Sequence, residues 1–143
     1  MKKRPGKTVL PKSEQRKILT RAKDFILKDL LPNDKINKII VLGSIVKGTF
    51  GRYEKAFKKR RYSDIDVLLL VENDFKVPKR WKTHLKSHLY NVYDIRKLDN
   101  KVLIQYIVCK KRSYQNKKHQ REAEKWGVPL LLKKSKHKFI VLY

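Results

Sequence analysis

The stretch that decides the fold is Ser63-Asp64-Ile65-Asp66-Val67-Leu68-Leu69-Leu70-Val71. Its second half is apolar on both faces, which is typical of a central strand that is covered on both sides. Side chains two residues apart in a strand point to the same face, so Asp64 and Asp66 are expected to project together. Two carboxylates held close raise each other's pKa unless a cation lies between them. Their hard oxygen ligands suit Mg²⁺ or Mn²⁺, and we expect a metal site here.

A second strand is expected upstream, over Ile39-Ile40-Val41-Leu42, ending at the turn Gly43-Ser44. Gly43 has no Cβ, so backbone N–H groups at this turn can approach a phosphate closely, and the Ser44 hydroxyl adds a donor. Metal-binding acids beside such a turn would form a site for a nucleoside triphosphate. Ions bridged by the two carboxylates would steer an in-line displacement at phosphorus. Taken separately, the acids also fit a solvated strand end, and the turn also fits an ordinary tight turn.

The rest of the chain predicts an α/β (α+β) fold with a mixed central sheet flanked by helices. Residues 1–11 read as a basic flexible tail, and 12–143 as a single domain. Within residues 45–62, Gly48 and Gly51 break up the first part, and the cations of the second part, from 52 to 61, predict a positive loop or a short helix. The first expected helix has Ser13 as its N-cap and ends at Pro32. Two further helices are expected over 78–89 and 114–126, and Gly127 closes the last of them. The remaining expected strands are 90–98, 102–109, 128–132 and 139–142, with a hairpin turn at 99–101.

The pattern as a whole resembles the DNA polymerase β-like nucleotidyltransferase superfamily, and its minimal members in particular. The matching residues are Gly43-Ser44, Gly48 and Ser63 to Leu68, within a stretch from 41 to 71 that has the same order of elements. Residues 123–130 are similar to the closing helix-to-strand step of those members. The spacer from Ser44 to Asp64 is longer than the compact family pattern, and the second, substrate-holding domain of the family is missing.

The resemblance implies roles for particular residues. Asp64 and Asp66 would bind the metal ions, and Gly43 and Ser44 would hold the triphosphate. Family members carry a third carboxylate on a later strand, which binds the catalytic metal and helps deprotonate the attacking hydroxyl. Asp94 is the best candidate for it, and an ion pair with Arg96 or a nearby lysine is its structural alternative.

The charge balance indicates an anionic partner. Lys and Arg total 38 and Asp and Glu total 13, so the formal net charge is 38 − 13 = +25. Phosphate backbones neutralise such a chain and release counterions when they bind, and aromatic residues among the cations favour contact with unpaired RNA. The expected RNA-binding residues form three groups: Lys2, Lys3 and Arg4; Arg52, Lys55, Lys58, Lys59, Arg60 and Arg61; Lys110, Lys111 and Arg112.

Two functions remain open at this point. The first is transfer of a nucleotide from a triphosphate, with Mg²⁺, to RNA or another hydroxyl. The second is a non-catalytic RNA-binding protein, ribosomal or ribosome-associated, that reuses the fold and binds ribosomal RNA. An antitoxin that modifies a protein by nucleotide transfer is a third interpretation, against which the excess charge argues. The sequence predicts no membrane span and no secretory signal, and the single cysteine, Cys109, excludes an internal disulfide and suits the cytoplasm.

Overall fold

The computed structural model describes residues 5–57 and 60–143 and has a six-stranded mixed sheet at its centre. The strand order is β6-β7-β8-β5-β2-β9, and only β5 and β8 run parallel among neighbouring strands of this sheet. The strands are β2 (Ile36–Leu42), β5 (Ile65–Val71), β6 (Lys82–Lys86), β7 (Asn91–Leu98), β8 (Val102–Lys110) and β9 (Phe139–Val141). The predicted α+β class with a mixed central sheet is therefore confirmed.

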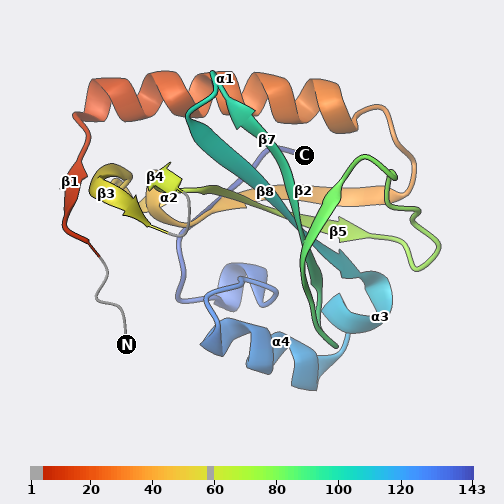
Figure 1. The fold of residues 1–143 in the computed structure, drawn as a ribbon. Helices are drawn as coiled ribbons and strands as arrows, with labels where there is room; N and C mark the ends of the chain where they lie inside the picture. Colours follow the sequence, from red (N-terminus) through yellow and green to blue (C-terminus); the bar gives the residue numbers. More distant parts are fainter. Residues whose placement is uncertain (1–4, 58–59) are drawn as a thin grey trace.

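Helices cover both faces of this sheet (Figure 1). Helix α1 (Lys12–Leu30) lies along one face, and α3 (Lys111–Tyr114) and α4 (Lys117–Lys125) lie on the other. Strand β5 shows why both are needed: Val67 and Leu69 pack in the core on the α1 side, whereas Leu68 and Leu70 pack with Ala123 of α4. The uninterrupted apolar run of β5 thus serves two cores, as a central strand requires.

A second, three-stranded sheet is built from β1 (Lys7–Val9), β3 (Gly51–Phe57) and β4 (Arg60–Tyr62). Residues 7–9 of the expected basic tail therefore form an edge strand. The positive loop or short helix expected over 52–61 is wrong, because the described residues of this stretch belong to β3 and β4, which follow the short α2 (Ser44–Lys47). A Cβ on Gly51 would collide with the carbonyl oxygen of Thr8, so the glycine allows β1 to approach β3 closely.

The helix expected over 78–89 is wrong, because this segment forms β6 and pairs with β7. The helical spacing of Trp81, Leu85 and Leu89 was accidental. Trp81 packs in the core on the α1 side, Leu89 packs in the core on the α4 side, and Leu85 is 50% exposed. Residues on one helix face would share one core, so the three apolar positions do not mark a helix.

Other boundaries also differ from the sequence prediction. Helix α1 begins at Lys12 after Pro11, so Ser13 is not its N-cap. The strand expected over 128–132 is a turn that leads into a short 3₁₀ helix (Leu132–Lys134). The hairpin turn at 99–101 and the glycine closure after α4 are confirmed, with positive φ at Asp99, Asn100 and Gly127.

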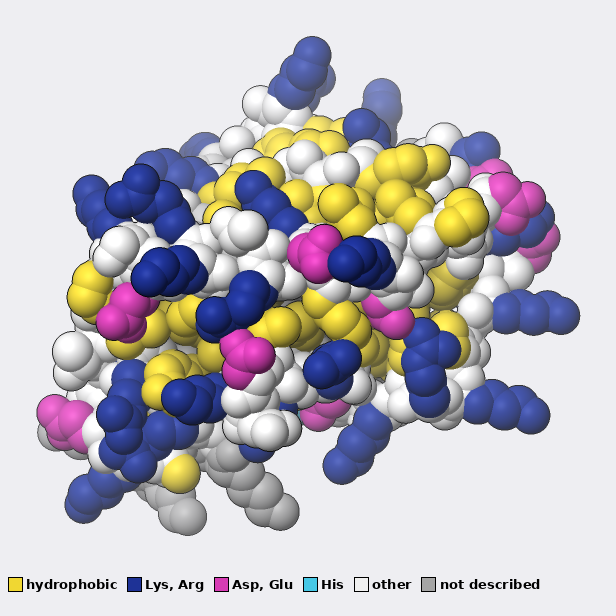
Figure 2. Space-filling model, turned by 90° about the horizontal axis from the view of Figure 1, so that it is seen from above, with side chains coloured by type: hydrophobic (Ala, Val, Ile, Leu, Met, Phe, Trp, Pro, Cys, Tyr) yellow, Lys and Arg dark blue, Asp and Glu magenta, His cyan; other side chains and the backbone are white. Residues whose placement is uncertain are grey.

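The described surface is strongly basic and has no membrane-spanning helix. Figure 2 looks onto the α1 side and shows Lys and Arg side chains spread over the whole visible face, with acidic groups scattered among them. None of the helices in the described residues combines the length and apolar character needed to cross a bilayer.

Candidate functional site

The two predicted acids lie where β5 begins, beside the end of β2. Asp64 directly precedes β5, and Asp66 is the second residue of the strand, opposite Leu42 in the antiparallel β2–β5 pair. The chain turns at Gly43 immediately after Leu42. A Cβ built on Gly43 would stand 3.1 Å from Oδ2 of Asp66. The structure therefore places the Asp66 carboxylate close to the Gly43 bend.

Gly43 is required at this bend for two separate reasons. Its φ of +86° lies in the region that residues with a side chain rarely adopt. Its missing Cβ also leaves room for the Asp66 carboxylate. The bend leads directly into α2, where the Gly43 carbonyl accepts hydrogen bonds from the N–H groups of Val46 and Lys47. Ser44 is the first residue of that turn.

Burial raises the pKa of both carboxyl groups. The pKa of Asp66 rises to about 7, mainly through loss of solvent and secondly through the Asp64 charge, while Arg60 opposes the rise. The pKa of Asp64 is raised by burial, against the opposing effect of Arg60, and the charge of Asp94 adds to the rise. Oδ1 of Asp64 is buried and has no hydrogen-bond partner within the described part of the chain. The carboxyl groups of the site, when ionised, carry more negative charge than Arg60 balances.

Arg60 supplies what positive charge the site has. Its Nη1 lies 2.7 Å from Oδ2 of Asp64, and its Nη2 lies 3.5 Å from Oδ1 of Asp94. The sequence placed Arg60 in the RNA-binding surface only, although its position four residues before Asp64 was a usable signal for this contact. The guanidinium comes from β4, so the basic hairpin reaches into the acidic site.

Asp94 belongs to the same site, but it lies on β7, and strand β8 separates it from Asp66 on β5. Gln105 of β8 is the residue opposite both Asp66 of β5 and Asp94 of β7. Its Nε2 donates a hydrogen bond of 2.6 Å to Oδ1 of Asp94. His84 of β6 lies 3.6 Å from the other oxygen of Asp94. The sequence analysis missed Gln105, because the apolar run in which it lies does not indicate which residues it pairs with on the neighbouring strands.

The expected alternative partner of Asp94 is not the one observed. Arg96 lies over the Phe25 ring, 4.8 Å from its centre, and Asp94 contacts Arg60 instead. Across residues 5–57 and 60–143, no three His, Cys, Asp or Glu side chains are grouped as a ready metal site. The three carboxylates that the sequence predicted as metal ligands, Asp64, Asp66 and Asp94, are therefore not grouped as one such site.

The expected RNA-binding cations fall into two regions. Arg52 and Lys55 of β3 and Arg61 of β4 are exposed on the small sheet, where Nε of Arg61 donates to the Tyr53 carbonyl at 2.7 Å. Lys110 ends β8, and Lys111 and Arg112 begin α3. Lys2, Lys3, Arg4, Lys58 and Lys59 lie outside the described residues. Comparison with known proteins gives no family model and no curated protein that matches this chain.

Proposed function

We propose that this chain is a metal-dependent nucleotidyltransferase of the DNA polymerase β-like superfamily, and that it acts on RNA. The observation that carries this proposal is the close approach of the Asp66 carboxylate to the Gly43 bend, with Asp64 two residues earlier, directly before β5. Two carboxylates beside a bend that can bind phosphate are the parts that transfer of a nucleotide from a triphosphate needs. The net charge of +25 supports RNA as the partner.

Asp64 and Asp66 would hold the metal. The buried Oδ1 of Asp64 has no partner within the described residues and is available as a ligand, and the absence of a Cβ at Gly43 leaves space beside Oδ2 of Asp66. Carboxylate oxygens are the donors that Mg²⁺ and Mn²⁺ prefer. When bound, the ion would supply positive charge to the phosphate that reacts.

The protein's own groups have separate tasks in this reaction. The backbone at Gly43 and the Ser44 hydroxyl hold the triphosphate of the nucleotide. An RNA hydroxyl oxygen forms a bond to the α-phosphorus as the bond to pyrophosphate breaks, and Asp94 accepts the hydroxyl proton. Arg60 leaves Asp94 and turns to the substrate phosphates, because a free carboxylate is needed to accept that proton.

Incorporation of labelled nucleotide into RNA in the presence of Mn²⁺ tests the proposal. We expect Asp64→Asn and Asp66→Asn each to lower the rate by at least about 100-fold, since each removes a charged oxygen ligand. Asp74→Asn is the matched control, because Asp74 is an exposed carboxylate paired with Lys35, away from the site. Equal inertness of the wild type and both variants with every nucleotide and acceptor would contradict the enzyme.

A second function, non-catalytic binding of ribosomal RNA, is favoured by the Arg60 contacts. An arginine between Asp64 and Asp94 neutralises acids that an enzyme would reserve for a metal. The protein would then use its basic surface as a cytoplasmic ribosomal or ribosome-associated component. A cytoplasmic location is also consistent with Cys109, which is free and buried.

Two measurements separate the functions. Electron paramagnetic resonance with Mn²⁺ reports whether the ion binds, and the enzyme requires binding that Asp66→Asn abolishes. Co-sedimentation with ribosomal particles over increasing salt reports stable association, which the second function requires and the first does not. Particle association without Mn²⁺ binding would favour the second function.

A further inference from the structure

A cavity of about 290 Å³ lies at the opposite end of the central strands from the acids. On β8, Gln105 pairs with Asp66, whereas Lys110 pairs with Val71 at the end of β5. The five residue steps from Asp66 to Val71 along β5 separate the two places by about 17 Å. Tyr93, which lines the cavity, belongs to the core on the α1 side, opposite to the side that Asp66 faces. The cavity is therefore separate from the candidate active site.

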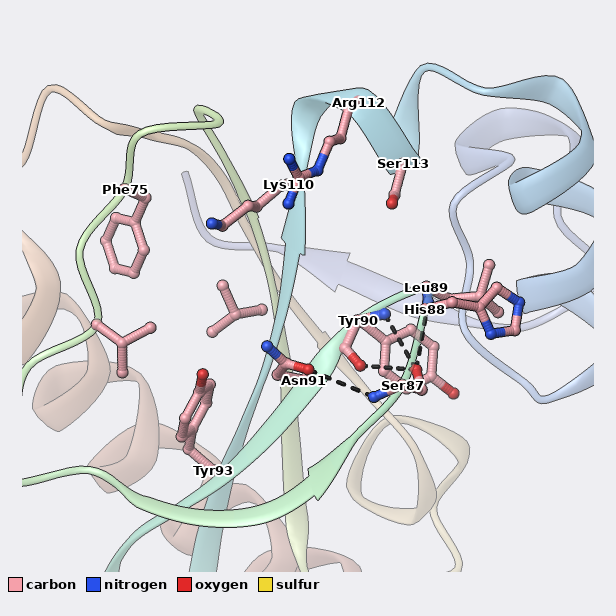
Figure 3. Close-up of a pocket in the computed structure, with 12 residues that line it drawn as sticks. Phe75, Ser87, His88, Leu89, Tyr90, Asn91, Tyr93, Lys110, Arg112 and Ser113 are labelled. Carbon is pink, nitrogen blue, oxygen red and sulfur yellow. Dashed lines mark hydrogen bonds between the residues drawn. The ribbon is translucent and has the colours of Figure 1, made fainter.

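Two cations stand at one rim of this cavity. Figure 3 shows the side chains of Lys110 and Arg112 close together above the opening. Neither forms an ion pair among the described residues, and none of the residues that line the cavity is acidic. Lys111, between them in the chain, instead lies 3.8 Å from Glu72 and does not line the cavity. Paired positive charges without a protein counterion are suited to a phosphate.

The opposite wall and the floor offer aromatic surface and a fixed donor. Phe75 and Tyr93 lie across the opening from the cations (Figure 3). The Oδ1 of Asn91 accepts a hydrogen bond of 3.4 Å from the Ser87 N–H, which orients its NH₂ group toward the cavity. The Ser87 hydroxyl in turn donates to the Tyr90 carbonyl at 2.7 Å, so the turn that orients Asn91 is itself held in place.

We propose that this cavity binds one unpaired nucleotide of a single-stranded RNA. Its phosphate contacts Lys110 and Arg112, its base lies against the aromatic wall, and the Asn91 amide donates to a carbonyl or ring nitrogen of the base. The volume admits one nucleotide and no longer stretch. A base within a duplex cannot enter, because its faces are stacked and its pairing edge is occupied. This inference rests on the proposed RNA partner and gives it a specific point of contact.

The aromatic wall provides its own reporter. Trp81 packs on Phe75 and Tyr93, with ring centres 6.2 and 5.9 Å away. The other tryptophan, Trp126, is 72% exposed, and its replacement in a Trp126→Phe background leaves Trp81 as the sole tryptophan. Emission of Trp81 is then followed during titration with inorganic phosphate, uridine monophosphate, single-stranded RNA and duplex RNA of the same length. We expect single-stranded RNA to change the emission at the lowest concentration and the duplex not to change it.

Charge variants test the rim. Lys110→Ala and Arg112→Ala are each expected to weaken binding of single-stranded RNA about five- to tenfold, the value of one charge-assisted contact. Lys76→Ala removes the same charge from an exposed position between Phe75 and Val77 without reaching the cavity, and we expect less than a twofold effect. Asn91→Asp keeps the shape but replaces a donor by a negative charge, and its expected loss is about tenfold.

The outcomes separate this inference from the proposed function. Equal losses for Lys110→Ala and Lys76→Ala, or RNA binding without a response from Trp81, would overturn the cavity site and leave the RNA partner standing. Binding of free uridine monophosphate as tightly as RNA would make the occupant a small molecule, which also overturns the proposal. A wild type that binds no RNA at all would overturn the RNA partner itself.

Discussion

The two ends of strand β5 have opposite electrostatic character. At its beginning, Arg60 is paired with Asp64 and Asp94, and the pKa of the Asp64 and Asp66 carboxyl groups is raised. Beyond its end, Lys110 and Arg112 line a cavity without a carboxylate. One end therefore attracts a cation and the other an anion. A nucleic acid reaction needs both, since the phosphates must be held while a metal acts on one of them.

The largest expected effect concerns the cationic end. Trp81 contacts the rings of Phe75, Tyr93 and Tyr106, and it is 6% exposed. Trp81→Ala is expected to lower the free energy of unfolding by about 3–5 kcal/mol, because it leaves a large cavity in the core. Urea denaturation measures the loss. Trp81→Phe, which keeps an aromatic ring, should lose much less, and equal losses would mean that the ring contacts contribute little.

A comparable effect is expected at the acidic end, and it depends on pH. The pKa of Asp66 is 3.8 when the chain is unfolded and about 7 when it is folded. The folded state therefore binds the proton more tightly, and this group costs stability as the pH rises from about 4 to 7. Above pH 7 the cost is constant, at up to about 4 kcal/mol. Asp66→Asn removes the cost, so the variant should exceed the wild type in stability at pH 8, and this excess should shrink toward pH 4.

The control for this pH dependence has the opposite sign. Lys35 lowers the pKa of Asp74, so that carboxyl contributes stability above the unfolded pKa and loses it as the pH falls. Asp74→Asn should therefore lose stability relative to the wild type at neutral pH. Thermal unfolding at a series of pH values compares both variants. An Asp66→Asn curve parallel to that of the wild type from pH 4 to 8 would show that Asp66 is not held in a desolvated state.

A smaller effect separates the close approach at Gly43 from its backbone conformation. Gly43 and Gly48 both have positive φ, but only at Gly43 would a Cβ meet Asp66; nothing lies within 4 Å at Gly48. We expect Gly48→Ala to cost about 1 kcal/mol through backbone strain alone. Gly43→Ala should cost about 1 kcal/mol more and should also weaken Mn²⁺ binding, which Gly48→Ala should not. Calorimetry and Mn²⁺ titration provide the two values, and identical effects would remove the special role of the bend.

The smallest expected effect comes from competition between Arg60 and a metal ion for the carboxylates. Arg60 contacts Asp64 and Asp94, whereas the neighbouring Arg61 bonds the Tyr53 carbonyl. Arg60→Ala is expected to tighten Mn²⁺ binding about threefold to tenfold, because the ion no longer displaces a guanidinium. Arg61→Ala should leave the metal affinity unchanged. Weaker binding in Arg60→Ala would indicate that Arg60 orients the carboxylates for the ion rather than competing with it.

The acidic end could be predicted from the sequence, and the cationic cavity could not. The alternation of Asp64 and Asp66 with apolar residues fixes a shared face, and Gly43 ends the preceding apolar run, so both signals are local. Asp94 was expected from the family resemblance, whereas Gln105 joins the site through strand pairing, which no local pattern reports. Part of the cavity is lined by residues 87–90, which follow β6, and the accidental helical spacing of Trp81, Leu85 and Leu89 predicted a helix in this segment. Tertiary packing that divides Trp81 and Leu89 between two cores outweighed that spacing.

The parallel pairing of β5 and β8 has a consequence for how the protein folds. Two parallel neighbours cannot be joined by a tight turn. The chain therefore passes through β6 and β7 between β5 and β8. Asp66 therefore meets Gln105 only after a loop of 38 residues has closed, which is entropically costly and slow compared with hairpin formation. The β7–β8 hairpin can assemble early, whereas the acidic centre is complete only when the last long-range contacts form.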